Sequence, residues 1–408
     1  MTGGGPDTPG ITGAQPDPSQ APAQPGSATG GSTASAATAT SGPAEPATAV
    51  VSAEATLRTD SRAQEERAAA QDRAELRRAS LGRRLLRRTI TANESWTILA
   101  LIVIMAFFTI KAPGTFLTTN DLSLIAQNAS PLLVMAIGQT FVILTAGIDL
   151  SVGSVLVLSS VIADEYYQHH GAGSGGWLTV IIGMVIAIAV TAAWGGMQGF
   201  LVAKAKIPPL ISTLGGFGAA LGISYLITGG VDLGSPPGPV KNTIGAGSVA
   251  GVSWLIVISF VATLVFGLIL SYTRFGRYTY AIGSNPEAGR RAGIAVDRHL
   301  IKVYALAGAL SGLAGIMSLG FNDGTTLTGH TTDNLTVITG VVLGGASLFG
   351  GRGSMLGTFI GIFIPQVLNS GLVILGVNVD WQQVAIGVVL VGAVYLDQFR
   401  LRLRDRAG

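Results

Sequence analysis

The sequence predicts an all-α fold: a polytopic membrane helix bundle of about ten transmembrane helices, preceded by a disordered N-terminal extension. Composition is the first observation, because 48% of the residues are hydrophobic and only 12% are charged, whereas soluble domains carry about 25% charged residues. Length is the second, because several apolar runs approach or exceed the roughly 20 residues that cross a bilayer as a helix. The third is pattern: from Trp96 to Phe399 the chain alternates apolar runs with short polar breaks.

The first 92 residues differ from the rest in composition. Residues 1–56 are mostly Gly, Pro, Ala, Ser and Thr, and we expect this low-complexity tail to be disordered because it cannot bury a core. It lacks the basic start and apolar stretch of a secretory signal peptide. Residues 57–92 are charged, helix-prone and arginine-rich at Leu76–Arg88. We interpret this juxtamembrane helix as the positive flank of the first span; a helix lying on anionic lipid is the alternative.

The predicted transmembrane domain covers residues 93–399 and is followed by a basic tail, 400–408. Its even number of spans places both termini on one side of the membrane, and on the other side only Lys111 and Lys241 carry a cation. Because basic loops stay in the cytoplasm, both termini are expected there. The loops on the opposite side hold acidic residues: Asp121, Asp164, Glu165, Asp232, Asp323, Asp333 and Asp380. The predicted spans are 95–111, 126–147, 151–167, 177–203, 208–229, 253–273, 300–321, 334–349, 354–376 and 381–398.

Glycines recur at helical spacing within the spans. Small residues on one helix face let two backbones approach closely in lipid, so these glycines predict tight helix packing, with a self-association face as a further use. The repeats are Gly195 with Gly199, Gly218 with Gly222, Gly308 with Gly312, and the series Gly353, Gly357 and Gly361.

The segment Arg274–His299 is the one long polar interruption that gathers several cations. Part of it has the signals of a short capped helix. Asn285 is a good N-cap, Pro286 suits the first helical position, Glu287 favours the positive helix end, and Gly293 can close the C-terminus. Such a helix on the cytoplasmic side is either a contact surface for a soluble partner or a solvated loop that fixes topology.

Ionisable groups are almost absent from the predicted span interiors, where proton-coupled carriers and ion channels need them. The nearest candidate is Asp149, which lies between two apolar runs. Gly147 can end the first helix, and Asp149 or Ser151 can cap the next one. Asp149 is therefore either a cap in a tight turn or part of a helix break at a gate. It has no chain of acidic partners, so it would be a poor proton relay.

The spans do contain neutral hydrogen-bonding side chains. Singly, each amide suits interhelical hydrogen bonding; together, and without buried charges, they favour passage of a neutral, hydroxyl-rich solute over an ion. These residues are Gln127, Asn128, Gln139, Thr140, Gln198, Asn322, Asn334, Gln366 and Asn369.

Several function classes are excluded by missing residues. The chain has no cysteine, its four histidines lack metal-ligand spacing, and nothing in the sequence suggests a Ser/His/Asp set or paired catalytic carboxylates. We therefore expect no metal site and no catalytic residues. There is no phosphate-binding loop, so a driven transport process would take its energy from another chain. The cations lie beside spans, which indicates topology and not nucleic-acid binding.

Three segments resemble the sugar-type (ribose, xylose and galactose) branch of ABC importer permeases. They are TFVILTAGIDLSVGS (Thr140–Ser154), RFGRYTYAIGSNPEAGRRAGI (Arg274–Ile294) and GVVLGGASLFGGRGSMLGTFIG (Gly340–Gly361). The resemblance covers roughly Asn93 to Asp397. It implies a multi-pass protein of the bacterial plasma (inner) membrane that works as a homodimer. Its partners would be a cytoplasmic ATPase subunit, which binds ATP and Mg, and an extracytoplasmic sugar-binding protein.

The resemblance also implies that a cytoplasmic loop with a Glu-Ala-Ala-x-x-x-Gly core docks into the ATPase. Glu287, Ala288 and Gly293 match that spacing, and Gly289 stands where the second alanine is usual. Arg277, Asn285 and Pro286 belong to the same coupling loop.

The chain departs from the family pattern at two other places. Gln139 replaces a usual methionine, and Asn334, Leu335 and Thr336 replace an acid-leucine-acid pattern.

The resulting expectation is a permease subunit of an ATP-driven monosaccharide importer, without its own ATPase activity or bound cofactor. A passive facilitator for a small neutral polyol or sugar is the alternative. The candidate residues for translocation or gating are Asn128, Gln139, Asp149, Ser151, Asn322, Asn334, Gln366 and Asn369.

Overall fold

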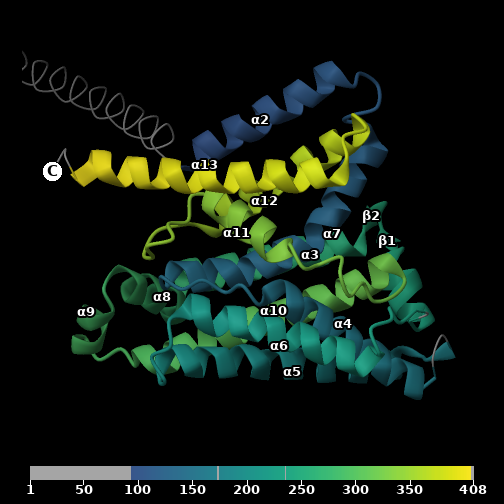
Figure 1. Ribbon diagram of the computed structural model, residues 1–408, viewed down its shortest axis with the longest axis horizontal. Helices are drawn as coiled ribbons and strands as arrows, with labels where there is room; N and C mark the ends of the chain where they lie inside the picture. The colour runs from purple at the N-terminus through teal and green to yellow at the C-terminus, as the bar shows by residue number, and fades with distance from the viewer. Residues whose placement is uncertain (1–92, 172–173, 235, 406–408) are drawn as a thin grey trace, which may run out of the picture. The chain divides into compact units, whose positions relative to one another are not determined.

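A computed structural model describes residues 93–171, 174–234 and 236–405 (Figure 1). The expected disordered tail and juxtamembrane helix lie outside the described residues, as does the last part of the basic tail. The helices are α2 (Asn93–Lys111), α3 (Thr119–Leu144), α4 (Val152–His169), α5 (Trp177–Ala203), α6 (Pro209–Thr228), η2 (Val240–Gly245), α7 (Trp254–Tyr272), α8 (Arg274–Ser284), α9 (Pro286–Arg291), α10 (Val296–Asn322), α11 (Asp333–Leu343), α12 (Met355–Ile374) and α13 (Val379–Asp405). A two-stranded hairpin joins β1 (Ser248–Val249) to β2 (Val252–Ser253).

Every predicted span coincides with one helix of the described chain, and α8, α9 and η2 lie in the connections. Six of these helices, α3, α5, α6, α7, α10 and α12, are long and apolar enough to cross a membrane. The extent predicted for the span 334–349 is wrong, because α11 has only 11 residues. At 1.5 Å per residue it covers roughly 16 Å, about half of a bilayer core. Gly344 caps it, and Gly345 turns the chain with φ of 90°.

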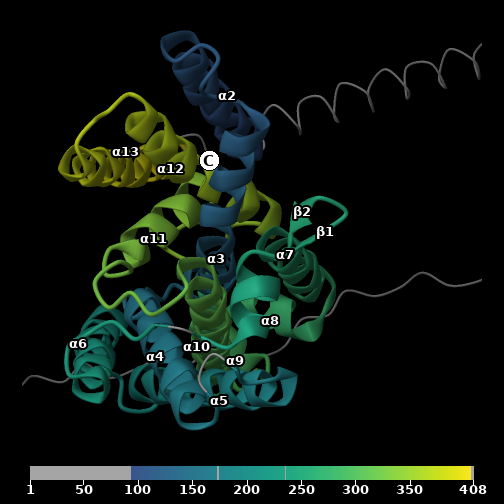
Figure 2. The same cartoon turned by 90° about the vertical axis from the view of Figure 1, so that its right-hand side faces the viewer.

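The centre of the bundle is α10, which packs against α3, α4 and α5. Figure 2 shows α10 between α3 and α5. The α5–α10 contact is made by two of the predicted glycine pairs. A Cβ on Gly195 would overlap the carbonyl oxygen of Tyr304, and one on Gly308 would overlap that of Thr191. Close backbone approach therefore requires glycine here, as the spacing predicts.

The other two glycine repeats behave differently from each other. On α12, a Cβ on Gly357 would overlap the carbonyl oxygen of Gly344, and one on Gly361 would overlap that of Gly340, so this series packs against α11 and its C-terminus. On α6, nothing in the described structure lies within 4 Å of a Cβ built on Gly218 or Gly222. The same spacing thus marks helix contacts within the subunit in one case and an open face in the other.

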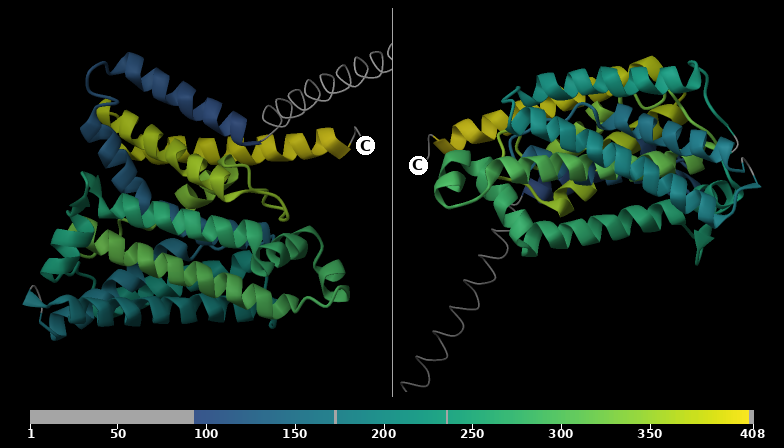
Figure 3. Two further views of the ribbon diagram at one scale, coloured as in Figure 1. Left: turned by 180° about the vertical axis from the view of Figure 1, so that it is seen from behind. Right: turned by 90° about the horizontal axis from the view of Figure 1, so that it is seen from below.

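The two ends of the bundle differ in structure. Helices α8 and α9 lie at one end, and the β1–β2 hairpin lies at the other (Figures 1 and 3). At the hairpin end, the α6–α7 connection is tied to the α10–α11 connection by an isolated bridge between Gly234 and Gly324 and by an ion pair between Lys241 and Asp323. These contacts hold the connection that precedes α11.

Asp164 was expected in a loop, and this expectation is wrong. The residue belongs to α4 and is fully buried. Helix α4 continues to His169 because the residues after Val161 still pack against α5 and η2, as Tyr167 and Ala163 do in a shared apolar cluster with Val180 and Val240.

Candidate functional site

A cavity of about 450 Å³ opens among α3, α10, α11 and α12. Four of the predicted translocation residues, Asn128, Asn322, Gln366 and Asn369, line it. The complete lining is Asp121, Leu124, Ile125, Asn128, Pro131, Leu132, Ser318, Phe321, Asn322, Gly329, His330, Asp333, Gln366, Asn369, Ser370, Val373 and Ile374. Its size is in the range of small-molecule sites. The tertiary fold therefore brings together amides that lie up to 241 positions apart in the sequence.

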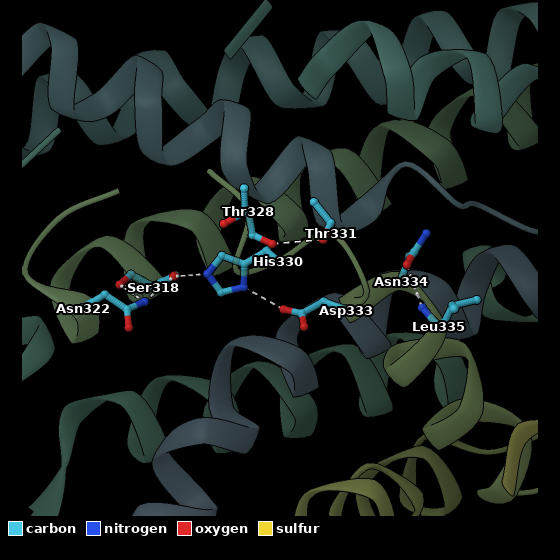
Figure 4. Close-up of polar contacts among 8 residues, drawn as sticks. All are labelled: Ser318, Asn322, Thr328, His330, Thr331, Asp333, Asn334 and Leu335. Carbon is cyan, nitrogen blue, oxygen red and sulfur yellow. Dashed lines mark hydrogen bonds and ion pairs between the residues drawn. The ribbon is translucent and has the colours of Figure 1, made fainter. Parts of the chain in front are cut away.

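One wall of the cavity carries a chain of polar contacts (Figure 4). His330 Nδ1 lies 2.7 Å from Asp333 Oδ2, and His330 Nε2 lies 2.6 Å from Ser318 Oγ. Asn322 Nδ2 donates to the same Ser318 Oγ at 3.0 Å and to the Ser318 carbonyl at 3.1 Å. The side chains of His330 and Asp333 are 16% and 18% exposed, so both face the cavity while remaining held.

Ser318, His330 and Asp333 meet in this row of contacts, although nothing in the sequence suggested a Ser/His/Asp set. The Asn322 amide donates to Ser318 Oγ, the atom that would be the nucleophile in such a set. This hydrogen bond lowers the nucleophilicity of that oxygen. The arrangement therefore suits hydrogen bonding better than covalent catalysis.

The opposite wall carries a second carboxylate and further amides. Ser370 Oγ donates to Asp121 Oδ1 at 2.8 Å, and the Leu117 backbone N–H donates to Asp121 Oδ2 at 3.3 Å. Asn128 Nδ2 donates to the Leu124 carbonyl at 2.9 Å. Asn369 Oδ1 is buried without a hydrogen-bond partner. No lysine or arginine is among the lining residues, so the cavity has acceptors and negative charge but no fixed cation.

The remaining translocation candidates, Gln139, Asp149, Ser151 and Asn334, form a second cluster at the turn between α3 and α4. Asp149 is only 2% exposed. Its Oδ1 accepts from the Ser151 backbone N–H at 2.8 Å and from Ser151 Oγ at 2.6 Å. The turn lies between the two spans. Burial raises the pKa of the Asp149 carboxyl, against the opposing effect of the two Ser151 hydrogen bonds.

Gln139 and Asn334, two of the departures from the family pattern, bind the backbone of this turn. The Gln139 amide can pair with both backbone groups of Asp149, donating to its carbonyl at 3.3 Å and accepting from its N–H at 3.2 Å. Asn334 Nδ2 donates to the Leu150 carbonyl at 3.0 Å. Both amides therefore supply hydrogen bonds that the non-helical backbone of this turn does not make with itself.

The capping residues expected in this turn need correction. Helix α3 ends at Leu144, and Ala146, not Gly147, adopts the left-handed conformation with φ of 61°. Gly147 is required for space, because a Cβ there would lie 2.6 Å from the Tyr304 hydroxyl oxygen. Ser151 occupies the N-cap position of α4, but its hydroxyl donates to Asp149 and makes no cap hydrogen bond.

The capped helix predicted within Arg274–His299 is present as α9. Asn285 Oδ1 accepts from the Ala288 N–H at 3.0 Å, Pro286 begins the helix, and Gly293 follows it with φ of 80°. The Glu287 side chain is 72% exposed, 3.9 Å from Arg291. These capping predictions are confirmed, and the acidic residue of the segment faces outward.

Helix α8 connects this exposed helix to the rest of the fold through backbone contacts. The Gly351 N–H donates to the Leu144 carbonyl at 2.9 Å, and a Cβ on Gly283 would overlap that same carbonyl oxygen. Tyr280 Oη donates to the Gly353 carbonyl at 2.8 Å. We call this contact of Leu144, Tyr280, Gly283, Gly351 and Gly353 the glycine junction. It joins the three segments that carry the family resemblance.

An ion cluster also braces the α9 end. Asp297 lies 3.1 Å from Lys204, 3.5 Å from Lys206 and 3.1 Å from Arg290. It links the α5–α6 connection to α9 and to the start of α10. Arg277, a predicted coupling residue, instead donates to the Tyr272 carbonyl at 3.1 Å on the surface.

Several polar residues of the cavity were not predicted as site residues, among them Asp121, Ser318, His330, Asp333 and Ser370. The spacing of His330 and Asp333, three residues apart before an apolar helix, was the signal available in the sequence. In the described part of the chain, no three His, Asp or Glu side chains gather as a metal site would require.

Comparison with known proteins places the chain in a family. The family described as branched-chain amino acid transport system, permease component, matches residues 122–394. The ribose import permease protein of Escherichia coli is 37% identical over 309 residues, which are 74% of this chain and 93% of the relative. The fructose import permease protein of Rhizobium meliloti is 34% identical over 74% of this chain and 84% of the relative.

The D-allose transport system permease protein of Escherichia coli is 34% identical over 74% of this chain and 90% of the relative. No solved structure is significantly similar to the chain. The resemblance to permeases of sugar ABC importers is confirmed by these relatives, and the several apolar helices make this a multi-pass inner membrane protein. The chain belongs to the family of permease components of membrane transport systems.

Proposed function

We propose that this chain is the membrane permease subunit of an ATP-driven ABC importer for a monosaccharide of the pentose or hexose type. An extracytoplasmic binding protein delivers the sugar, and a separate cytoplasmic ATPase subunit binds ATP and Mg and supplies the energy. Two copies of the permease form the translocating unit. The bilayer surrounds the apolar helices, and both termini lie in the cytoplasm.

The observation that carries this proposal is the chemistry of the cavity. A solute with a carboxylate, such as an amino acid, needs a cation or a set of N–H donors, and the cavity lining holds no lysine or arginine. Asp121 and Asp333 would repel that carboxylate. Hydroxyl groups can donate to carboxylate and amide oxygens and need no counter-charge. The cavity therefore favours a sugar over the branched-chain amino acids in the family description.

The role of α8 and α9 follows from exposure and connection. Glu287 and the capped helix around it are accessible to a soluble subunit. The glycine junction passes a displacement of α8 to the end of α3 and to the α11–α12 connection, because at Gly283 the backbones meet directly and no side chain can adjust by a rotamer change. Along the chain, the Asp149 turn directly follows the end of α3, and α11 directly precedes the α11–α12 connection. ATPase closure would thus reach the residues between the cavity and the α8 end.

Reconstitution tests the proposal. The permease, purified with its ATPase and binding protein into proteoliposomes, is expected to take up labelled ribose, fructose or allose only with ATP and Mg present, and not to take up leucine. Equal sugar uptake without ATP would favour the passive facilitator instead. Uptake of leucine and of no sugar would overturn the assignment of substrate class.

A further inference from the structure

His330 lies in the cavity lining, where its contacts affect which hydrogen-bonding atoms the neighbouring side chains present to a solute. His330 contacts a carboxylate through Nδ1 and a hydroxyl through Nε2, at 2.7 Å and 2.6 Å. It lies in the α10–α11 connection, between Ser318 of α10 and Asp333 of α11. Figure 4 shows these side chains in one row with Asn322.

The hydrogen-bond polarity along this row follows from the acceptor at its end. The Asp333 carboxylate only accepts, so His330 Nδ1 carries a proton. In the neutral ring Nε2 then accepts from the Ser318 hydroxyl, and in the charged ring Nε2 donates to it. In both cases Ser318 Oγ retains a lone pair for Asn322 Nδ2, which also binds the Ser318 carbonyl. The amide nitrogen of Asn322 is thereby held against α10, and its Oδ1 is the atom left for the cavity.

Asn128 has the same polarity. It commits Nδ2 to the Leu124 carbonyl, which leaves its Oδ1. Asn369 differs, because its Oδ1 is fully buried and does not reach the cavity that the residue lines. Both carboxylates are already satisfied in part, Asp121 by Ser370 and Leu117 and Asp333 by His330. The carbonyl oxygens of Asn322 and Asn128 and the remaining lone pairs of the two carboxylates are therefore acceptors that suit the hydroxyl groups of a solute.

We propose that the permease itself holds its solute by accepting hydrogen bonds from solute hydroxyl groups, and that His330 is the positioning residue that holds Ser318 and Asp333 in place beside Asn322. This inference rests on the proposed function, because it concerns the same cavity. It goes further in assigning recognition to the permease as well as to the binding protein. It also states that the O–H donors of the solute contribute to this recognition.

The test uses direct binding to the permease–ATPase complex in nanodiscs, without binding protein. Labelled D-ribose, D-fructose and D-allose are measured first, and the tightest of them is compared with its deoxy and deoxy-fluoro analogues. Fluorine keeps a weak acceptor but has no proton to donate. At one or more hydroxyl positions, we expect the deoxy analogue and the matching fluoro analogue both to bind roughly tenfold more weakly than the parent sugar. Recovery of parent affinity by every fluoro analogue would overturn the proposal.

Variants test the positioning role of His330. His330→Leu removes both contacts and should weaken binding roughly tenfold, whereas His330→Gln keeps one N–H donor and one acceptor and should restore most of it. His169→Leu, a histidine exposed on α4 outside the cavity, is the matched control and should bind like the wild type. The elution and melting profiles of each variant show whether it folds.

The outcomes separate this inference from the proposed function. Wild-type affinity in a folded His330→Leu variant would overturn the positioning role. If none of the three sugars binds the complex, although the complete system imports one of them, the proposed function stands and the permease site is refuted. If the complete system imports none of them, the proposed function itself fails.

Discussion

The glycine junction and the cavity are built by opposite means. At the junction, α8, the end of α3 and the α11–α12 connection meet backbone to backbone, and side chains are excluded by glycines such as Gly283 and Gly351. At the cavity, polar side chains of α3, α10 and α12 line a space without satisfying one another fully. Backbone contacts transmit displacement because they have no rotamers to absorb it. Loosely satisfied side chains can exchange partners with a passing solute.

The largest effect is expected from closing the space at the junction. Gly283→Ala introduces a Cβ that overlaps the Leu144 carbonyl oxygen and lies 2.6 Å from the Gly351 nitrogen. The backbones must separate, which should cost about 1–3 kcal/mol of stability and most of the uptake. Gly218→Ala on α6, where nothing lies within 4 Å, is the matched control. Melting temperature and proteoliposome uptake are measured, and equal behaviour of the two variants would show that the junction tolerates separation.

A second experiment disrupts the proposed contact between α9 and the ATPase subunit and leaves the glycine junction itself unchanged. Glu287→Arg reverses an exposed charge near the N-terminus of α9, where an acidic residue is stabilising. We expect loss of uptake and of ATPase co-purification at normal membrane expression, and the same from deletion of residues 285–293. Glu165→Arg, near the end of α4, is the control. Normal uptake by the Glu287 variant or by the deletion would refute the coupling role of α9.

A smaller effect is expected in the cavity, where side chains and not backbones are involved. Asn369→Leu keeps the approximate size of the side chain but removes an amide from the cavity lining. It should raise the solute concentration for half-maximal uptake about tenfold, with little change in the maximal rate. Gln127→Leu on α3, an amide outside the cavity lining, should leave both values near those of the wild type. A fall in maximal rate alone would assign Asn369 to gating instead of binding.

The smallest effect concerns the unusual glycine of α9. A Cβ on Gly289 would make only ordinary contacts, 3.8 Å from Ile294 and from Val296. Gly289→Ala should therefore stabilise α9 by about 1 kcal/mol and preserve uptake. Gly293→Ala should destabilise it by about 1–2 kcal/mol, because φ there is 80°. Hydrogen exchange of the α9 amides measures both changes. Loss of uptake in the alanine variant at 289 would mean that the ATPase needs the backbone at that position.

The sequence alone predicted the helices and the two ends of α9. Apolar runs of about 20 residues can satisfy their backbones in lipid only as helices, so every predicted span coincides with a helix. The α9 cap was predictable because Asn285, Pro286 and Gly293 act on their own neighbours. The length of α11 was not predicted, because the apolar run continues past Gly344, although Gly344 and Gly345, which cap the helix and turn the chain, were a local signal in the sequence.

Only the tertiary structure decided which of several identical sequence patterns form helix contacts. Gly195 and Gly218 have the same local spacing, yet one meets α10 and the other meets nothing within the described subunit. The predicted amides separated into the cavity and the Asp149 turn, and Ser318, His330 and Asp121 joined the cavity without any pattern that linked them. Periodicity reports the face of one helix, whereas a site depends on which faces of distant helices meet. In a membrane that choice depends on close packing, because lipid solvates every apolar face equally well.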